Sequence, residues 1–162
     1  MKTLTIIIGT MLTLMQTTTR LKSTDFDGLL GHQWTGILTY LDYGTNKLEP
    51  IASELTVTDG KAAGSYSWAT VYPQEVSHNS IDEVIISKDG TLVDDELVKE
   101  RILLPNGTLK FVTIKQGSDN NRKATFKFTY LVGKTTFSRK KEVCYDGTTQ
   151  WFTRNELSLK TK

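Results

Sequence analysis

Hydrophobic and polar residues alternate along most of this chain, in runs separated by turn sequences. In the run that begins at Trp34, side chains alternate between two faces because successive residues of a strand point in opposite directions. One face of this run carries Trp34, Gly36, Leu38 and Tyr40. Glycine inside a strand is typical of a bend or of another group approaching the backbone. The run therefore predicts a kinked first strand that begins at a tryptophan.

The same alternation predicts strands along the rest of the chain, over residues 51–58, 64–72, 81–87, 96–104, 109–115, 123–132, 135–145 and 149–159. Segment 91–95 is ambiguous. Segment 96–104 has helical propensity, but the neighbouring strands and Pro105 at its end favour a strand. Turn sequences such as Asn106-Gly107 separate the runs, and Asn-Gly predicts a type I′ hairpin turn.

Consecutive strands joined by tight turns pair with their neighbours in an antiparallel meander. One open sheet of about nine or ten strands would leave two exposed edges, and closure of the sheet removes them. We therefore predict an all-β protein, an antiparallel up-and-down β-barrel of about 8–10 strands. The alternative, a sandwich of two sheets, usually has long crossing connections that are not evident here.

Residues 1–23 differ from the rest of the chain. Lys2 precedes an apolar run over residues 4–15, which suits the core of a signal peptide and is shorter than the roughly 20 residues of a membrane-spanning helix. We expect a signal peptide over residues 1–23, no stable membrane span, and a mature domain over residues 26–162. The mature protein is then secreted or periplasmic in a bacterium.

Composition and charge restrict the function further. The 162 residues carry a formal net charge of +2, which does not favour a nucleic-acid partner. Cys144 is the single cysteine, and a lone cysteine on a strand is commonly a small buried residue. His32 and His78 have no second ligand at metal spacing, and no nucleophile motif occurs. We therefore expect no metal, no cofactor and no enzymatic activity.

Trp34 near the start of the first strand and Arg154 in the last strand resemble the calycin superfamily, which contains the lipocalins and related barrels. Gly31 would match the glycine of the family's opening motif, with one more residue before the tryptophan than usual, and the Thr-Asp-Tyr motif of typical lipocalins is missing. The resemblance implies a lipocalin-like barrel in which Trp34 and Arg154 pack together as a structural seal. The pattern from Trp34 to Tyr43, with Phe152 and Arg154, is also similar to a group of uncharacterised secreted bacterial proteins, which implies no particular activity.

Aromatic residues that share strand faces are the candidate ligand-binding residues. If these faces point inward, they either line an apolar cavity or simply fill the barrel. A cation on the inward face beside Phe137 would suit an acidic group of a ligand. The candidates are Tyr66, Trp68, Tyr72, Phe126, Phe128, Tyr130 and Arg139.

Two functions are consistent with these patterns. The first is an exported, lipocalin-like barrel that binds a small, mainly apolar ligand with an acidic head group. The second is a solid barrel that acts as a non-catalytic interaction module, in which Lys127, Lys140 and Lys160 on a basic face meet an acidic partner. The volume and polarity of the barrel interior distinguish them, and the oligomeric state stays open.

Overall fold

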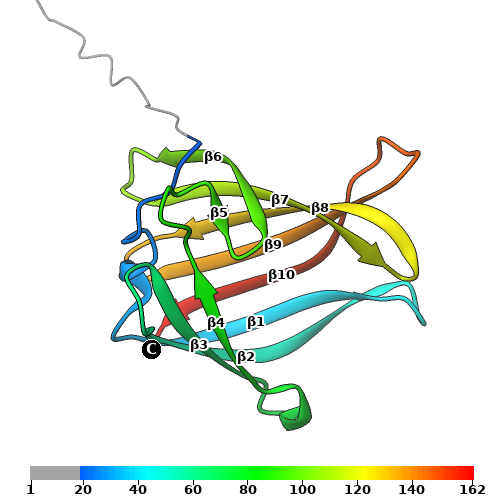
Figure 1. Cartoon of the computed structure of the whole chain (residues 1–162). Helices are drawn as coiled ribbons and strands as arrows, with labels where there is room; N and C mark the ends of the chain where they lie inside the picture. The colour runs from blue at the N-terminus through cyan, green and yellow to red at the C-terminus, as the bar shows by residue number, and fades with distance from the viewer. Residues whose placement is uncertain (1–18) are drawn as a thin grey trace, which may run out of the picture.

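The computed structural model describes residues 19–162 as one ten-stranded antiparallel sheet rolled into a nearly closed barrel (Figure 1). The strands are β1 (Gln33–Asp42), β2 (Lys47–Asp59), β3 (Ser65–Val71), β4 (Ser80–Ile85), β5 (Leu92–Val93), β6 (Glu96–Leu103), β7 (Leu109–Asp119), β8 (Arg122–Val132), β9 (Thr136–Tyr145) and β10 (Phe152–Thr161). Two short 3₁₀ turns, η1 (Asp27–Leu29) and η2 (Val76–His78), complete the described elements. The predicted all-β, up-and-down fold is confirmed.

The first and last long strands lie side by side at the middle of the sheet, whose order is β4-β3-β2-β1-β10-β9-β8-β7-β6-β5. The two ends of the sheet meet through a bridge between Ile86 and Val93, beside which the Asp94 N–H donates to the Ile85 carbonyl. Within the described chain, β3 is the only strand paired with residues 80–84 of β4. The barrel therefore closes at one end, and its two edges separate toward the other.

Phe26 and Leu29 fill the closed end of the barrel, and both side chains are completely buried. The Phe26 ring contacts Tyr66 and Trp68 edge-on, with centroid distances of 5.6 and 5.2 Å. The buried Trp34 indole N–H donates to the Leu29 carbonyl over 3.0 Å. The segment around η1 is therefore a hydrophobic plug that the first strand fixes in place.

The packed chain begins before this plug. Leu21 belongs to the hydrophobic core, and its N–H donates to the Gly90 carbonyl over 2.8 Å. Asp25 accepts two bonds of 2.7 Å from the Arg101 guanidinium. The folded domain thus extends to Leu21, ahead of the predicted start at Phe26. Most of the expected signal peptide, residues 1–18, lies outside the described residues.

The turns differ from the sequence prediction in one respect. At the predicted type I′ turn, Gly107 has a positive φ of 80° but Asn106 does not, so this hairpin has another geometry. Both residues of a type I′ turn have positive φ, and this holds at Asn120 and Asn121, with φ of 46° and 60°. Those two residues join β7 to β8, so β7 extends to Asp119 instead of ending at residue 115.

Gly36 on β1 lies opposite Leu159 on β10 in the strand register. A Cβ atom at this position would lie 2.0 Å from the Ser158 carbonyl oxygen, a separation that no side chain can occupy. Of the two roles that the sequence allowed for this glycine, a bend or a close approach, the structure shows the close approach, because the backbone of β10 fills the space of a side chain.

We predict that Phe26→Ala lowers the free energy of unfolding by about 3–5 kcal/mol, because it removes the ring at the centre of the plug. Val76→Ala is the control, since Val76 is 69% exposed and its truncation should change stability by no more than about 0.5 kcal/mol. Urea unfolding of both variants measures the difference. Equal losses would contradict the role of the plug.

Candidate functional site

A cavity of about 450 Å³ lies inside the barrel, among side chains from β1, β3, β4, β8, β9 and β10. Leu38 and Leu157 supply apolar wall, and Asn155 supplies a polar amide. Ligand pockets commonly have volumes of about 300–1,000 Å³. The interior is therefore only partly filled by side chains, and it has room for a small molecule.

Three of the predicted aromatic residues line this cavity: Trp68, Tyr72 and Tyr130. Trp68 on β3 and Tyr130 on β8 are buried, as alternation along their strands predicts. Tyr72 follows β3 and is partly buried. The structure thus brings these rings together from segments far apart in the sequence.

The other predicted aromatic residues point inward but do not line the cavity. The Tyr66 hydroxyl donates to the Asp27 carboxylate over 2.6 Å and so belongs to the plug. Phe126 and Phe128 contact each other edge-on at 6.4 Å, and the Lys141 ammonium lies 3.8 Å from the Phe126 ring centroid. These side chains fill the barrel, which is the other outcome that the sequence allowed.

Glu96 on β6 places a carboxylate inside the barrel, with only 7% of its side chain exposed. Its Oε1 accepts a bond of 2.9 Å from Arg139, and its Oε2 accepts bonds from Tyr130 (2.8 Å) and Thr113 (2.5 Å). Arg139 also donates to the Tyr130 hydroxyl over 3.0 Å. A buried charge is tolerated when it is paired and hydrogen-bonded, and Glu96 meets both conditions.

This network changes the predicted role of Arg139. The residue lines the cavity as expected, but its charge is already compensated by Glu96. Burial, together with the charge of Glu96, raises the pKa of Tyr130, so its hydroxyl stays protonated and donates. Sequence reasoning missed Glu96 and Thr113, although both occupy inward positions in the alternation of their strands.

Trp68 carries the polar atom of the cavity wall that lacks a partner. Its indole Nε1 is buried and has no hydrogen-bond partner among the described residues. A buried donor without a partner costs about 1–3 kcal/mol. The ring that bears this N–H lines the cavity.

Two carboxylates stand at the rim of the cavity. Asp82 on β4 lies opposite Trp68 in the strand register, and its Oδ2 accepts a bond of 2.7 Å from the Ser80 hydroxyl. Asp94 follows β5, and its Oδ1 accepts a bond of 2.8 Å from the Ile85 N–H. Burial raises the pKa of Asp94 above its ordinary value.

The structure does not bring Trp34 and Arg154 together, so the seal that the resemblance implied is incorrect as a contact. Trp34 lies opposite Thr161, seven residues beyond Arg154 on β10 (161 − 154 = 7). Seven residues span roughly 23 Å of strand. Because β1 and β10 are antiparallel, the start of β10 lies beside the end of β1, far from the plug.

Arg154 instead fastens the open end of the barrel. Its Nη1 donates to the Leu41 carbonyl over 2.5 Å, and its Nε lies 3.3 Å from an oxygen of Asp119. The hydroxyls of Tyr43 and Tyr145 both donate to the Asp119 carboxylate. This Asp119 cluster links the end of β7 to the ends of β1 and β10, with which β7 is not paired in the sheet.

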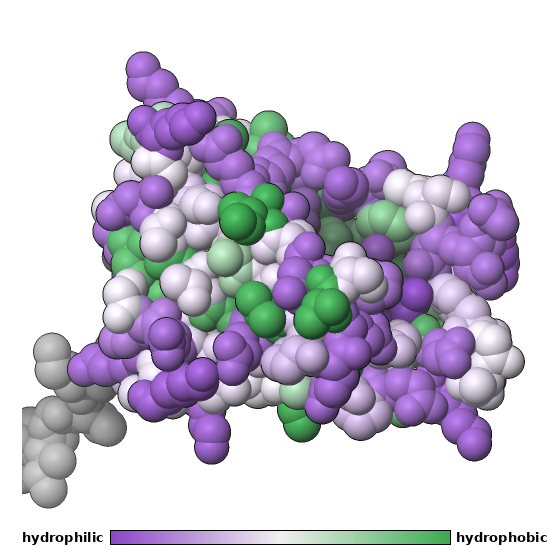
Figure 2. Space-filling model, turned by 90° about the horizontal axis from the view of Figure 1, so that it is seen from below, coloured by the Kyte–Doolittle hydropathy of each residue, from purple (hydrophilic) through white to green (hydrophobic). Residues whose placement is uncertain are grey.

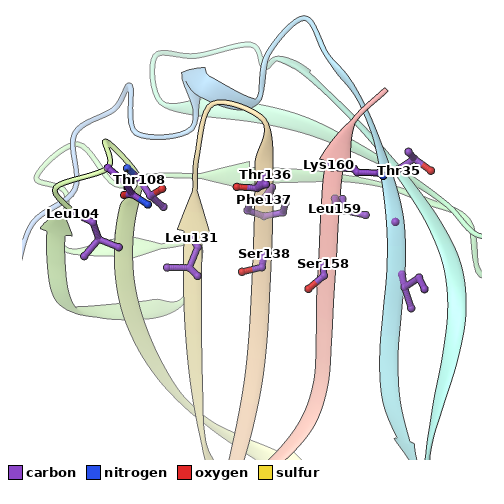
Figure 3. A pocket seen from close by; sticks show the side chains of 13 residues that line it. Thr35, Leu104, Thr108, Leu131, Thr136, Phe137, Ser138, Ser158, Leu159 and Lys160 are labelled. Carbon is purple, nitrogen blue, oxygen red and sulfur yellow. Dashed lines mark hydrogen bonds between the residues drawn. The ribbon is translucent and has the colours of Figure 1, made fainter.

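A second hollow, of about 630 Å³, lies on the outer surface over β1, β8, β9 and β10 (Figure 3). Figure 3 shows Leu131, Ser138 and Ser158 on separate strands along its wall. Ser138 lies opposite both of the others in the sheet register, so the three form one row across neighbouring strands. Its lining combines the buried side chains of Phe137 and Leu159 with hydroxyl-bearing and more exposed residues, and none of these described residues has a buried polar side-chain atom without a partner.

Two of the three lysines of the predicted basic face share a single carboxylate. Lys127 and Lys140 lie 2.9 and 3.6 Å from the carboxylate of Glu142. Lys160 lines the outer hollow. On the surface seen from below the barrel, hydrophobic residues form separate small clusters among hydrophilic ones (Figure 2). These observations do not favour the solid interaction module.

Comparison with known proteins supports the fold and nothing finer. No family model matches the chain, and no curated protein is detectably similar to it in sequence. The crystal structure of Rv2717c from M. tuberculosis is similar in fold, with a TM-score of 0.52 and 12% sequence identity over 88% of this chain and 99% of that one. The nearly closed barrel is consistent with the expected calycin-like architecture. Over residues 19–162, no helix has the length and hydrophobicity needed to cross a membrane.

We predict that Glu96→Gln lowers the free energy of unfolding by about 2–3 kcal/mol, because Arg139 loses its counter-ion. The loss is smaller than for a fully buried ion pair, because the Arg139 side chain is partly exposed. The matched control is Glu54→Gln, which breaks an exposed pair with Lys162 (3.0 Å) and should cost less than about 1 kcal/mol. Urea unfolding compares the two. Equal losses would show that the interior pair has no special role.

We predict that Asp119→Asn loosens the open end of the barrel, because Arg154 loses its carboxylate partner, a change worth about 1–3 kcal/mol locally. Hydrogen exchange should become faster for the amides near the turn between β7 and β8, while exchange in the plug stays unchanged. Asp146→Asn, in the turn between β9 and β10, is the control. Unchanged exchange near Asn120 in the Asp119 variant would contradict this role.

Proposed function

We propose that this protein is a non-catalytic binding protein that holds a small, partly apolar molecule inside its barrel. The observation that supports the proposal most strongly is the internal cavity of about 450 Å³, whose wall carries the buried, unpartnered N–H of Trp68. A protein that used its interior only for packing would gain stability by filling this space. A bound molecule with an acceptor atom would fill it and pair the donor.

The wall of the cavity suggests what kind of molecule fits. Leu38, Leu157 and the ring of Trp68 offer apolar surface, while Asn155 and Asp82 offer polar atoms. Ligand pockets commonly combine apolar walls with a few placed polar groups. The favoured ligand is therefore a small, flat molecule with at least one acceptor atom. An acidic head group loses its main support, because Arg139 is bound to Glu96.

Binding is favoured over catalysis by the types of residue in the wall. A nucleophile requires a base within hydrogen-bond reach. The residues that line the cavity include no histidine, cysteine or lysine, and their one hydroxyl–carboxylate pair, Ser80 with Asp82, lies at the rim, where Asp82 is exposed to solvent. The Tyr130 hydroxyl, which is available in principle for proton transfer, is occupied by Glu96 and Arg139.

Export belongs to the same proposal. Its support is the apolar run at residues 4–15 after Lys2, which has the length of a signal-peptide core. A barrel that carries a small molecule outside the cytoplasm would need its cavity intact after processing. The contact of Leu21 with Gly90 would be kept if cleavage occurred before Leu21.

We predict that 7-methoxy-4-methylcoumarin, a flat fluorescent molecule with a carbonyl acceptor, binds the wild-type protein. Trp68→Phe should weaken binding about five- to tenfold, because the ring is kept and one hydrogen bond is lost. Trp151→Phe is the control, since Trp151 is 41% exposed and does not line the cavity. Fluorescence titration measures all three affinities.

A second probe separates the hydrogen bond from simple packing. 2-Methoxynaphthalene has a similar flat shape without the carbonyl, so its affinity should be nearly the same in the wild-type protein and in Trp68→Phe. If the wild-type protein binds neither molecule, the proposed function is wrong. If Trp68→Phe weakens the binding of both molecules equally, the indole N–H does not have the proposed role.

A further inference from the structure

The rim of the internal cavity carries an excess of negative charge. Asp82, Glu83 and Asp94 all line the cavity, and Arg139 is the single basic residue among its lining residues. The Arg139 guanidinium lies 2.9 Å from Glu96, so one carboxylate already balances its charge. The three rim carboxylates therefore have no basic partner within the cavity wall.

We propose that the cavity selects small aromatic molecules that carry a positively charged amine, with the amine at Asp82 and Asp94 and an acceptor atom at the Trp68 N–H. This inference rests on the proposed function and assigns the ligand class of the same site. It replaces the acidic head group expected from the sequence with a basic one.

The Trp68 ring forms the part of the cavity wall that lies beside the rim carboxylate of Asp82. Trp68 is 92% buried (8% exposed), and its Nε1 lacks a partner in the described chain. Asp82 lies directly opposite Trp68 on the same face of the sheet. Side chains in such opposed positions are close neighbours, so a molecule bound at Asp82 lies beside the Trp68 ring.

The geometry of Asp94 suits a fixed carboxylate rather than a mobile one. Its backbone has a φ of 52°, which asparagine and aspartate adopt more readily than other residues. The Ile85 N–H holds its Oδ1 at 2.8 Å, which orients the carboxylate at the meeting point of β4 and β5. A carboxylate held in place in this way can bind a cation without first being ordered.

The aromatic residues of the wall add to the attraction for a cation. Trp68 and Tyr72 line the cavity, whereas the Tyr130 ring is already stacked on Phe111 and lies under the Arg139 guanidinium. The face of an aromatic ring attracts a cation, most strongly when the site is shielded from water. Flat ligands with a charged amine can therefore use both the rings and the rim carboxylates.

Three coumarins of matched shape test the charge of the ligand. They are 7-methoxycoumarins that carry an aminomethyl, a methyl or a carboxymethyl group at the same ring position, and they differ mainly in charge. We expect the amine to bind about tenfold more tightly than the neutral molecule, and the carboxylate to bind more weakly than both. Fluorescence titration at neutral pH and low salt measures the three affinities.

Variants locate the source of the preference. Asp82→Asn and Asp94→Asn should each reduce the advantage of the amine over the neutral coumarin several-fold. Asparagine keeps an acceptor for the Ile85 N–H and tolerates the backbone of position 94, so the fold should be retained. Asp59→Asn, at the exposed end of β2 outside the cavity lining, should leave the advantage unchanged.

Each outcome has a definite meaning. An amine preference that falls in both cavity variants and persists in Asp59→Asn supports the inference. Equal binding of the three coumarins, tighter binding of the carboxylate, or a preference that the cavity variants leave intact overturns it while the proposed function stands. No binding of any of the three overturns the proposed function, and the inference with it.

Discussion

The pairing of β1 with β10 is the contact on which the rest of the structure depends. It joins the first long strand to the last one, and Gly36 allows it because a side chain there would meet the Ser158 carbonyl. With these strands joined, the two ends of the sheet are brought round to meet between Ile86 and Val93. The barrel then has one end filled by the plug around Phe26 and another end that the Asp119 cluster holds together.

The interior between these two ends contains both apolar packing and a buried ion pair. The plug buries aromatic rings in edge-on contacts, as a packed core does. Further along, Glu96 and Arg139 form a hydrogen-bonded pair that occupies the interior without filling it. Buried ion pairs contribute little net stability compared with apolar packing. The Glu96–Arg139 pair beside the cavity is therefore consistent with a binding site for a ligand.

The sequence predicted the fold well because each part of that prediction depends on local patterns. Alternation identified the strands and the inward direction of Trp68 and Tyr130, and turn residues placed most of the hairpins. The position of the type I′ turn was mispredicted, because Asn-Gly permits this turn without requiring it. The up-and-down barrel followed from the number of strands and the tight turns between them.

The contacts within the site could not be predicted in the same way. Glu96 meets Arg139 across 43 positions of sequence, and Arg154 meets Leu41 across 113, so both contacts depend on the register of strands that are distant in the chain. Local alternation fixes the face on which a residue lies but not its neighbour across the barrel. The contact between Trp34 and Arg154 was expected from the family resemblance alone, and the register shows that the two residues lie at opposite ends of their shared strand pair.

The most direct test of a ligand-binding interior is the NMR signal of the indole N–H groups. The chain has three tryptophans, and their indole protons have different surroundings: Trp34 donates to Leu29, Trp151 is exposed, and Trp68 is buried without a partner. During titration with 7-methoxy-4-methylcoumarin, the Trp68 signal should move downfield while the other two stay in place. A Trp68 signal that does not change, or three signals that move together, would contradict a binding site inside the barrel.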